Sequence, residues 1–123
     1  MKSIRISEAE WQVMSLAWER PPIAAADVVE TLSQRTGWHS RTIRTLLDRL
    51  VKKGALKAAR DGKRYLYTPQ VSLEECVRQE SQSFLERVFG GEPAPLLLHL
   101  VKESNLSKDE IRELKRLLSE KER

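Results

Sequence analysis

The sequence predicts a mainly α-helical fold with one β-hairpin between two groups of helices. Residues 39–54 combine an apolar stripe with a basic outer face, which is the pattern of an amphipathic surface helix. Two short strand-like runs follow directly, and further helical patterns fill the rest of the chain. Two helices, a basic helix and a hairpin form the order of a winged helix-turn-helix domain, which we place at residues 1–70. A three-helix domain is expected at residues 71–123.

Start and stop signals predict the first two helices. Ser7-x-x-Glu10 is a capping box, so a helix should begin directly after Ser7. Pro21-Pro22 should end this helix, because the residue before a proline avoids helical backbone angles. A second helix is expected from about residue 25 to 35.

The third helix is the most informative segment. A turn at residues 36–39 precedes it, Ser40 is the expected N-cap, and Gly54 is the expected residue after its last turn. Helical spacing predicts an inward apolar stripe of Ile43, Leu46, Leu47, Leu50 and Val51.

A β-hairpin is predicted directly behind this helix. Residues 55–59 and 64–68 form the two strand patterns, and Asp61-Gly62 between them is a dipeptide typical of hairpin turns. Tyr65 and Tyr67 should share one face of the hairpin, because side chains alternate along a strand.

The basic charge is confined to the amino-terminal part of the chain. Residues 1–70 hold 13 basic and 7 acidic side chains, whereas residues 71–123 hold 9 basic and 11 acidic ones. Residues 35–64 alone hold 10 basic and 2 acidic side chains. This clustering predicts a surface for a polyanion, with double-stranded DNA as the expected partner.

The polar residues of this region divide into two expected roles. Side chains on the first and middle turns of the third helix suit base edges in a major groove, whereas cations farther along suit phosphates. The expected base contacts are Arg41, Thr42, Arg44 and Thr45. The expected phosphate contacts are Ser40, Arg49, Lys52, Lys53, Lys63 and Arg64.

Asp48 is the exception on the outward face, because a carboxylate repels phosphate. Either it pairs with Arg44 or Lys52 at helical spacing, or it accepts a hydrogen bond from a cytosine amine. An alternative for the whole basic face is a winged-helix module that binds an acidic protein partner. Sequence preference and salt dependence of duplex binding distinguish this alternative from DNA recognition.

The sequence predicts no enzyme, no cofactor and no metal site. The chain has 1 cysteine and 2 histidines, with no paired-carboxylate motif and no glycine-rich phosphate loop. Cys76 lies on an apolar helical face and is expected to be a small buried side chain. A lone cysteine fits a reducing cytoplasm, and no stretch is apolar enough to insert into a membrane.

Three helices are predicted in the carboxy-terminal part. Capping boxes at Ser72-x-x-Glu75 and Ser107-x-x-Glu110 begin the first and the last, and a short apolar helix follows a loop at residues 93–95. They form too small a group to bury their own apolar faces, so we expect a dimerisation domain that pairs with a second copy. The expected dimerisation residues are Phe84, Leu85, Val88, Leu97, Leu100, Val101, Ile111, Leu114, Leu117 and Leu118.

Several segments together resemble one family. These are ISEAEWQVM near the start, WHSRTIRTLLDRLVKKGAL, the hairpin ending RYLYTP, and LSKDEIRELKRLL near the end. In this order they are similar to the BlaI/MecI penicillinase repressors. The resemblance implies a homodimeric transcriptional repressor that binds an inverted-repeat operator of β-lactam-resistance or related genes. It also implies that Arg41, Thr42 and Arg44 approach operator bases.

The resemblance further implies how repression ends. A membrane-bound sensor metalloprotease leads to cleavage of such repressors within the dimerisation domain, which places the expected bond at His99-Leu100. The family usually has asparagine followed by an aromatic residue there. Either induction in this protein does not use that bond, or a protease of different specificity recognises it.

Overall fold

The computed structural model describes residues 4–123, and this part of the chain is mainly helical, as predicted. The elements are α1 (Glu8–Glu19), β1 (Ile23–Ala24), α2 (Ala25–Thr36), α3 (Ser40–Lys53), β2 (Leu56–Asp61), β3 (Arg64–Pro69), α4 (Leu73–Phe89), α5 (Pro93–Glu103) and α6 (Lys108–Lys121). They divide into two compact units, Met1–Glu80 and Ser81–Arg123. The division falls within α4, because Cys76 on its second turn is buried in the core of the first unit.

Helix α1 begins as its sequence predicts. The Ser7 hydroxyl accepts a hydrogen bond from the Glu10 N–H at 3.1 Å, and the Glu10 carboxylate accepts one from the Ser7 N–H at 2.8 Å. The inner face of the helix packs against α3, and its indole rings lie near each other, with Trp11 edge-on to Trp18 at 5.4 Å. The Trp18 Nε1–H donates to the carbonyl of Val71 at 2.9 Å, which ties the end of the hairpin to α1.

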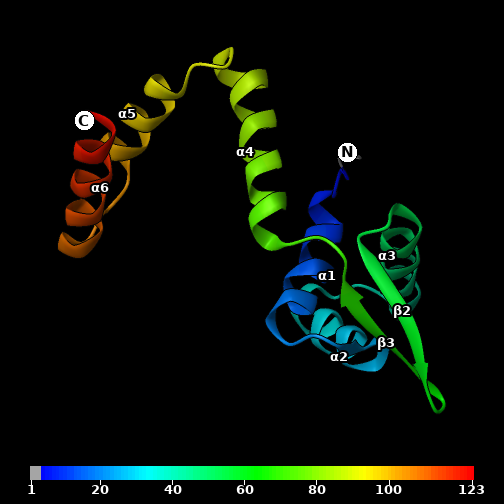
Figure 1. Cartoon of the computed structure of the whole chain (residues 1–123). Coiled ribbons are helices and arrows are strands. Elements are labelled where there is room, and N and C mark those ends of the chain that lie inside the picture. Colours follow the sequence, from blue (N-terminus) through cyan, green and yellow to red (C-terminus); the bar gives the residue numbers. More distant parts are fainter. Residues whose placement is uncertain (1–3) are drawn as a thin grey trace. The chain divides into compact units, whose positions relative to one another are not determined.

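The sheet contains a strand that the sequence did not predict. Ile23 and Ala24 pair antiparallel with Tyr67 and Leu66, so the strand order is β1-β3-β2. Two residues are too few to show the alternation of apolar and polar side chains that predicts a strand. They form one only because the free edge of β3 pairs with their backbone. The hairpin β2–β3 extends past the helices of the first unit to its tip (Figure 1).

The core of the first unit lies among α1, α2, α3 and the base of the hairpin. The predicted stripe of α3 supplies much of it, since Ile43, Leu46, Leu47 and Leu50 are all buried and Val51 is half-buried. Helices α1 and α2 contribute the rest of the central contacts with Val13, Met14, Leu16, Val28 and Leu32.

Helix α3 starts one residue earlier than its sequence suggested. The expected N-cap, Ser40, is the first helical residue, and His39 is the cap, with its Nδ1 accepting a hydrogen bond from the Arg41 N–H at 3.0 Å. Gly54 ends the helix with φ +85°, a left-handed conformation that glycine adopts without a steric penalty.

The hairpin turn also lies one residue from its predicted place. Asp61 pairs with Arg64 as the last residues of the two strands, so the loop consists of Gly62 and Lys63 rather than Asp61 and Gly62. Gly62 has φ +67°, as the first loop position of a two-residue hairpin requires. Lys63 therefore lies at the tip.

The second unit differs from the sequence-based expectation at one helix. The predicted loop at residues 93–95 is the first turn of α5, with Pro93 at a position where a missing N–H costs no hydrogen bond. Helix α6 begins at the predicted capping box of Ser107 and Glu110. The start of α4 belongs to the first unit. Only half of the predicted capping box forms there, with the Ser72 hydroxyl accepting from the Glu75 N–H at 3.0 Å.

Candidate nucleic-acid interface

The outward side of α3 gathers most of the predicted contact residues on one surface. Its apolar stripe is fixed in the core, so the remaining positions are held rigidly toward solvent. Arg41, Thr42, Arg44, Thr45 and Arg49 are all exposed there, and so are Ser40 and Lys52 at the two ends. The Thr45 hydroxyl donates to the Arg41 carbonyl at 2.9 Å. Its oxygen therefore keeps only acceptor capacity, which suits an adenine or cytosine amine.

The hairpin contributes a second group of cations. Lys63 is exposed at the tip, and the Arg64 guanidinium lies 3.1 Å from an Asp61 carboxylate oxygen in an exposed ion pair. The Arg60 guanidinium lies 5.5 Å from the centroid of the Tyr65 ring, a cation–π contact that holds it against the hairpin. These groups extend the basic surface beyond α3.

Lys53, one of the expected phosphate contacts, has partners inside the protein. Its Nζ lies 2.5 Å from the Glu10 carboxylate and 2.8 Å from the Arg5 carbonyl, so two of its three donors are used inside the protein. Burial tends to raise the pKa of Glu10, but hydrogen bonds from Lys53 and Ser7 outweigh it and lower that pKa below its usual value. Lys53 therefore joins the end of α3 to α1.

Asp48 forms a salt bridge with neither Arg44 nor Lys52 among the residues that the structure describes. Instead it lies at a cleft between α3 and the hairpin, with a volume of about 430 Å³. The cleft, here called the wing cleft, is lined by Asp48, Val51, Lys52, Ala58, Tyr65 and Tyr67. No pattern in the sequence joins these positions, because the fold brings the two elements together.

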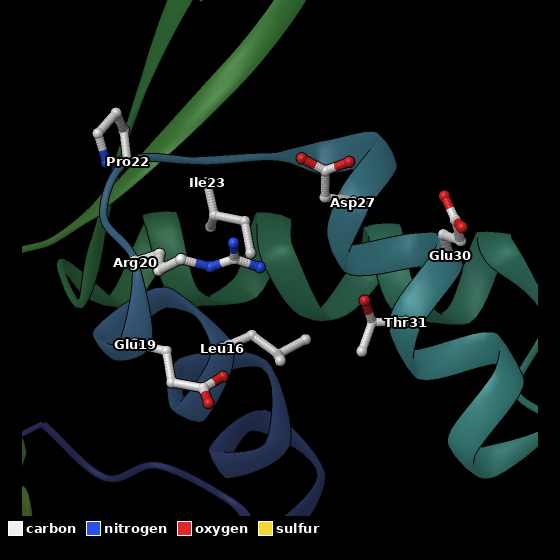
Figure 2. Close-up of a pocket in the computed structure, with 8 residues that line it drawn as sticks. All are labelled: Leu16, Glu19, Arg20, Pro22, Ile23, Asp27, Glu30 and Thr31. Carbon is white, nitrogen blue, oxygen red and sulfur yellow. The ribbon is translucent and has the colours of Figure 1, made fainter.

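A second hollow, also of about 430 Å³, lies between the end of α1, β1 and α2 (Figure 2). Three carboxylates, those of Glu19, Asp27 and Glu30, and the guanidinium of Arg20 line it. An excess of negative charge disfavours a polyanion at this hollow. Within residues 4–123 no group of histidine, cysteine or acidic side chains could hold a metal ion, and no helix is long and apolar enough to cross a membrane.

Comparison with known proteins identifies the family. The family model described as penicillinase repressor matches residues 6–120. The chain belongs to the penicillinase-repressor family. It is 37% identical over 121 residues to the penicillinase repressor of Bacillus licheniformis, covering 98% of this chain and 94% of that protein. It is 35% identical over 120 residues to the methicillin resistance regulatory protein MecI of Mammaliicoccus sciuri, covering 98% of both.

Two solved structures are similar to 61% of the chain. One is the solution structure of the DNA-binding domain of the repressor BlaI, with a TM-score of 0.56 and 39% identity over 61% of this chain and 93% of that one. The other is the monomeric form of Bacillus licheniformis BlaI in complex with the blaP half-operator, with a TM-score of 0.54, 39% identity and the same coverage. The winged helix-turn-helix fold is thus confirmed, and as a member of the penicillinase-repressor family the chain is a transcriptional repressor rather than an enzyme.

Proposed function

We propose that this repressor acts as a homodimer on an inverted-repeat DNA operator, with α3 of each copy in a major groove. The observation that carries the proposal is the exposed face of α3, where arginines and threonines lie on a helix whose other face is fixed in the core. Its first turns hold the expected base contacts Arg41, Thr42, Arg44 and Thr45. Arg49, Lys52, Lys63, Arg64 and Ser40 surround them as phosphate contacts.

Burial in the second unit supports the dimer. None of the described residues 81–123 is buried, and the apolar side chains of Leu97, Val101 and Leu118 are 50%, 54% and 58% exposed. Phe84, Val88, Leu100, Ile111 and Leu117 are exposed as well, and Leu85 and Leu114 are half-buried. Three helices that bury so little of their own apolar surface need a partner, and a second copy offers the matching surface.

Dimerisation gives the repressor its control point. Joining two DNA-binding units gains about 10²–10⁴ in avidity, so loss of the dimer weakens operator binding without altering α3. Cleavage at His99-Leu100, both exposed on α5, would remove α6 from the dimerisation unit. β-Lactam-resistance genes or related ones are the proposed targets, and a membrane sensor metalloprotease is the proposed source of the cleavage signal.

A pair of neighbouring substitutions on α6 tests the proposal. Leu118→Glu places a charge on the apolar face, whereas Ser119→Glu places the same charge on the polar face one position away. We expect Leu118→Glu to give a monomer by light scattering and to lose about 10²-fold or more in affinity for a duplex selected by the protein itself from a random pool. Ser119→Glu should remain a dimer of unaltered affinity.

Two results would contradict the proposal. A Leu118→Glu protein that binds the selected duplex as tightly as the unaltered protein would disprove the link between dimerisation and affinity. A selected duplex without two-fold symmetry would disprove the inverted repeat.

A further inference from the structure

The wing cleft has one polar group whose position the packing of the core does not explain. Tyr67 is only 7% exposed and its ring belongs to the core cluster, yet its hydroxyl forms no hydrogen bond with another described residue. Within the described residues, every fully buried side-chain oxygen or nitrogen has a hydrogen-bond partner. The Tyr67 hydroxyl has none, so it is not fully buried, and it reaches the surface at the cleft that it lines.

The hairpin face that forms one wall of the cleft carries further donors. Tyr67 pairs with Ala58 and Tyr65 pairs with Arg60 across the two strands, so these four side chains share one face. Tyr65 is 46% exposed, with the Arg60 guanidinium over its ring. On the opposite wall, α3 presents Lys52 and Asp48. Donors and cations thus outnumber the single carboxylate.

The width of the major groove determines how close the sugar-phosphate backbone of DNA comes to a helix that lies in it. A helix with its side chains is about 10–12 Å across, and the major groove of B-DNA is about 12 Å wide. A helix in that groove has a sugar-phosphate backbone along each flank. One flank of α3 faces the hairpin, so with α3 in a major groove the backbone on that side would pass the mouth of the wing cleft.

We propose that the wing cleft holds one phosphate of the DNA backbone, bound by the hydroxyls of Tyr65 and Tyr67 and by the Lys52 ammonium. Asp48 lowers the affinity of the site for every duplex, because its carboxylate repels the phosphate. The inference rests on the proposed DNA binding of α3 and adds to it a phosphate contact made jointly by α3 and the hairpin. Burial raises the pKa of the Tyr67 hydroxyl, and Asp48 raises it further, so the group stays protonated and able to donate.

The test compares three full-length variants on duplex DNA. Tyr67→Phe removes only the hydroxyl and should weaken binding to every duplex about 3- to 10-fold, the effect of one lost hydrogen bond. Asp48→Asn removes the repulsion and should strengthen binding about 3- to 10-fold on all sequences. Asp27→Asn, at the rim of the other hollow, is the matched control for loss of a charge and should change affinity less than about twofold.

A neutral methylphosphonate placed at single positions of the selected duplex locates the phosphate. The unaltered protein should lose affinity at each linkage that it contacts. At one of these linkages in each half-site, and not at the others, Tyr67→Phe should lose clearly less than the unaltered protein does. Urea unfolding of Tyr67→Phe should match the unaltered protein, because the ring remains in the core.

The outcomes separate this inference from the proposed function. If Tyr67→Phe leaves duplex binding unchanged, the phosphate site is wrong and the proposed function stands. If Asp48→Asn weakens binding and shifts the sequence preference, the phosphate site is also wrong, and Asp48 contacts a base instead. Absence of duplex binding by the unaltered protein overturns the proposed function and the phosphate site together.

Discussion

The ion pair between Lys53 and Glu10 leads to a quantitative prediction about stability. Glu10 is only 2% exposed, and its carboxylate lies 2.5 Å from the Lys53 Nζ and 2.8 Å from the Ser7 N–H. Lys53→Met keeps the length of the side chain but leaves the carboxylate buried with one hydrogen bond. Breaking a fully buried pair costs about 3–5 kcal/mol, and since the Lys53 side chain is 37% exposed we expect about 2–3 kcal/mol.

Urea unfolding followed by tryptophan fluorescence measures this cost, because Trp11 lies one residue from Glu10 on α1. In the double variant Glu10→Gln/Lys53→Met no charge remains to be buried, so part of the lost free energy of unfolding should return. The two substitutions should couple by about 1 kcal/mol or more. A cost below about 0.5 kcal/mol for Lys53→Met, or additive effects in the double variant, would refute the reasoning.

The pH dependence of the same variants gives an independent measurement. The pKa of Glu10 is lowered in the folded protein from its ordinary value of 4.5. The ion pair therefore stabilises the fold fully above pH 4.5 and loses this contribution as the pH falls through the lowered pKa. The difference in free energy of unfolding between Lys53→Met and the unaltered protein should accordingly shrink in acid. A difference that stays constant down to pH 3 or so would show that packing rather than charge causes the loss.

Two further predictions concern single side chains. Arg44→Ala should cost about 1–3 kcal/mol of DNA-binding free energy and relax the sequence preference. Lys63→Ala should weaken binding to all duplexes equally and reduce by about one the slope of log affinity against log salt concentration. Identical behaviour of the two variants in a gel-shift series over several sequences would contradict this division of roles. Cys76 is 4% exposed, and burial, together with the charges of Glu75 and Glu80, raises the pKa of its thiol. A disulfide reagent at pH 8 should therefore label Cys76 only as fast as the first unit opens. Rapid labelling of the folded protein would contradict the burial of this thiol.

The elements that could be predicted from the sequence are those whose signals are local. The capping boxes at Ser7 and Ser107 begin α1 and α6 where expected, because both partners of each box lie within four residues. The stripe of α3 is buried as its periodicity predicts. The predicted contact residues of α3 lie together on its exposed side for the same reason, since one helix carries both faces.

Small errors arose where two local signals compete. His39 and Ser40 both have an acceptor for an N-cap, and the histidine ring nitrogen takes that role here. Asp61-Gly62 and Gly62-Lys63 are both acceptable as hairpin loops, and the pairing of Asp61 with Arg64 decides between them. Pro93 can precede a helix or begin one, and in α5 it begins one.

By itself the sequence determined the order of the elements, the basic face of α3 and the family, because helical and strand periodicity and short motifs are written in neighbouring residues. Only the tertiary structure decided that Ile23 and Ala24 form a strand, that Lys53 neutralises Glu10, and that Tyr67 and Asp48 share a cleft. Each of these depends on residues far apart in the chain, and such contacts exist only after the helices and the hairpin have packed.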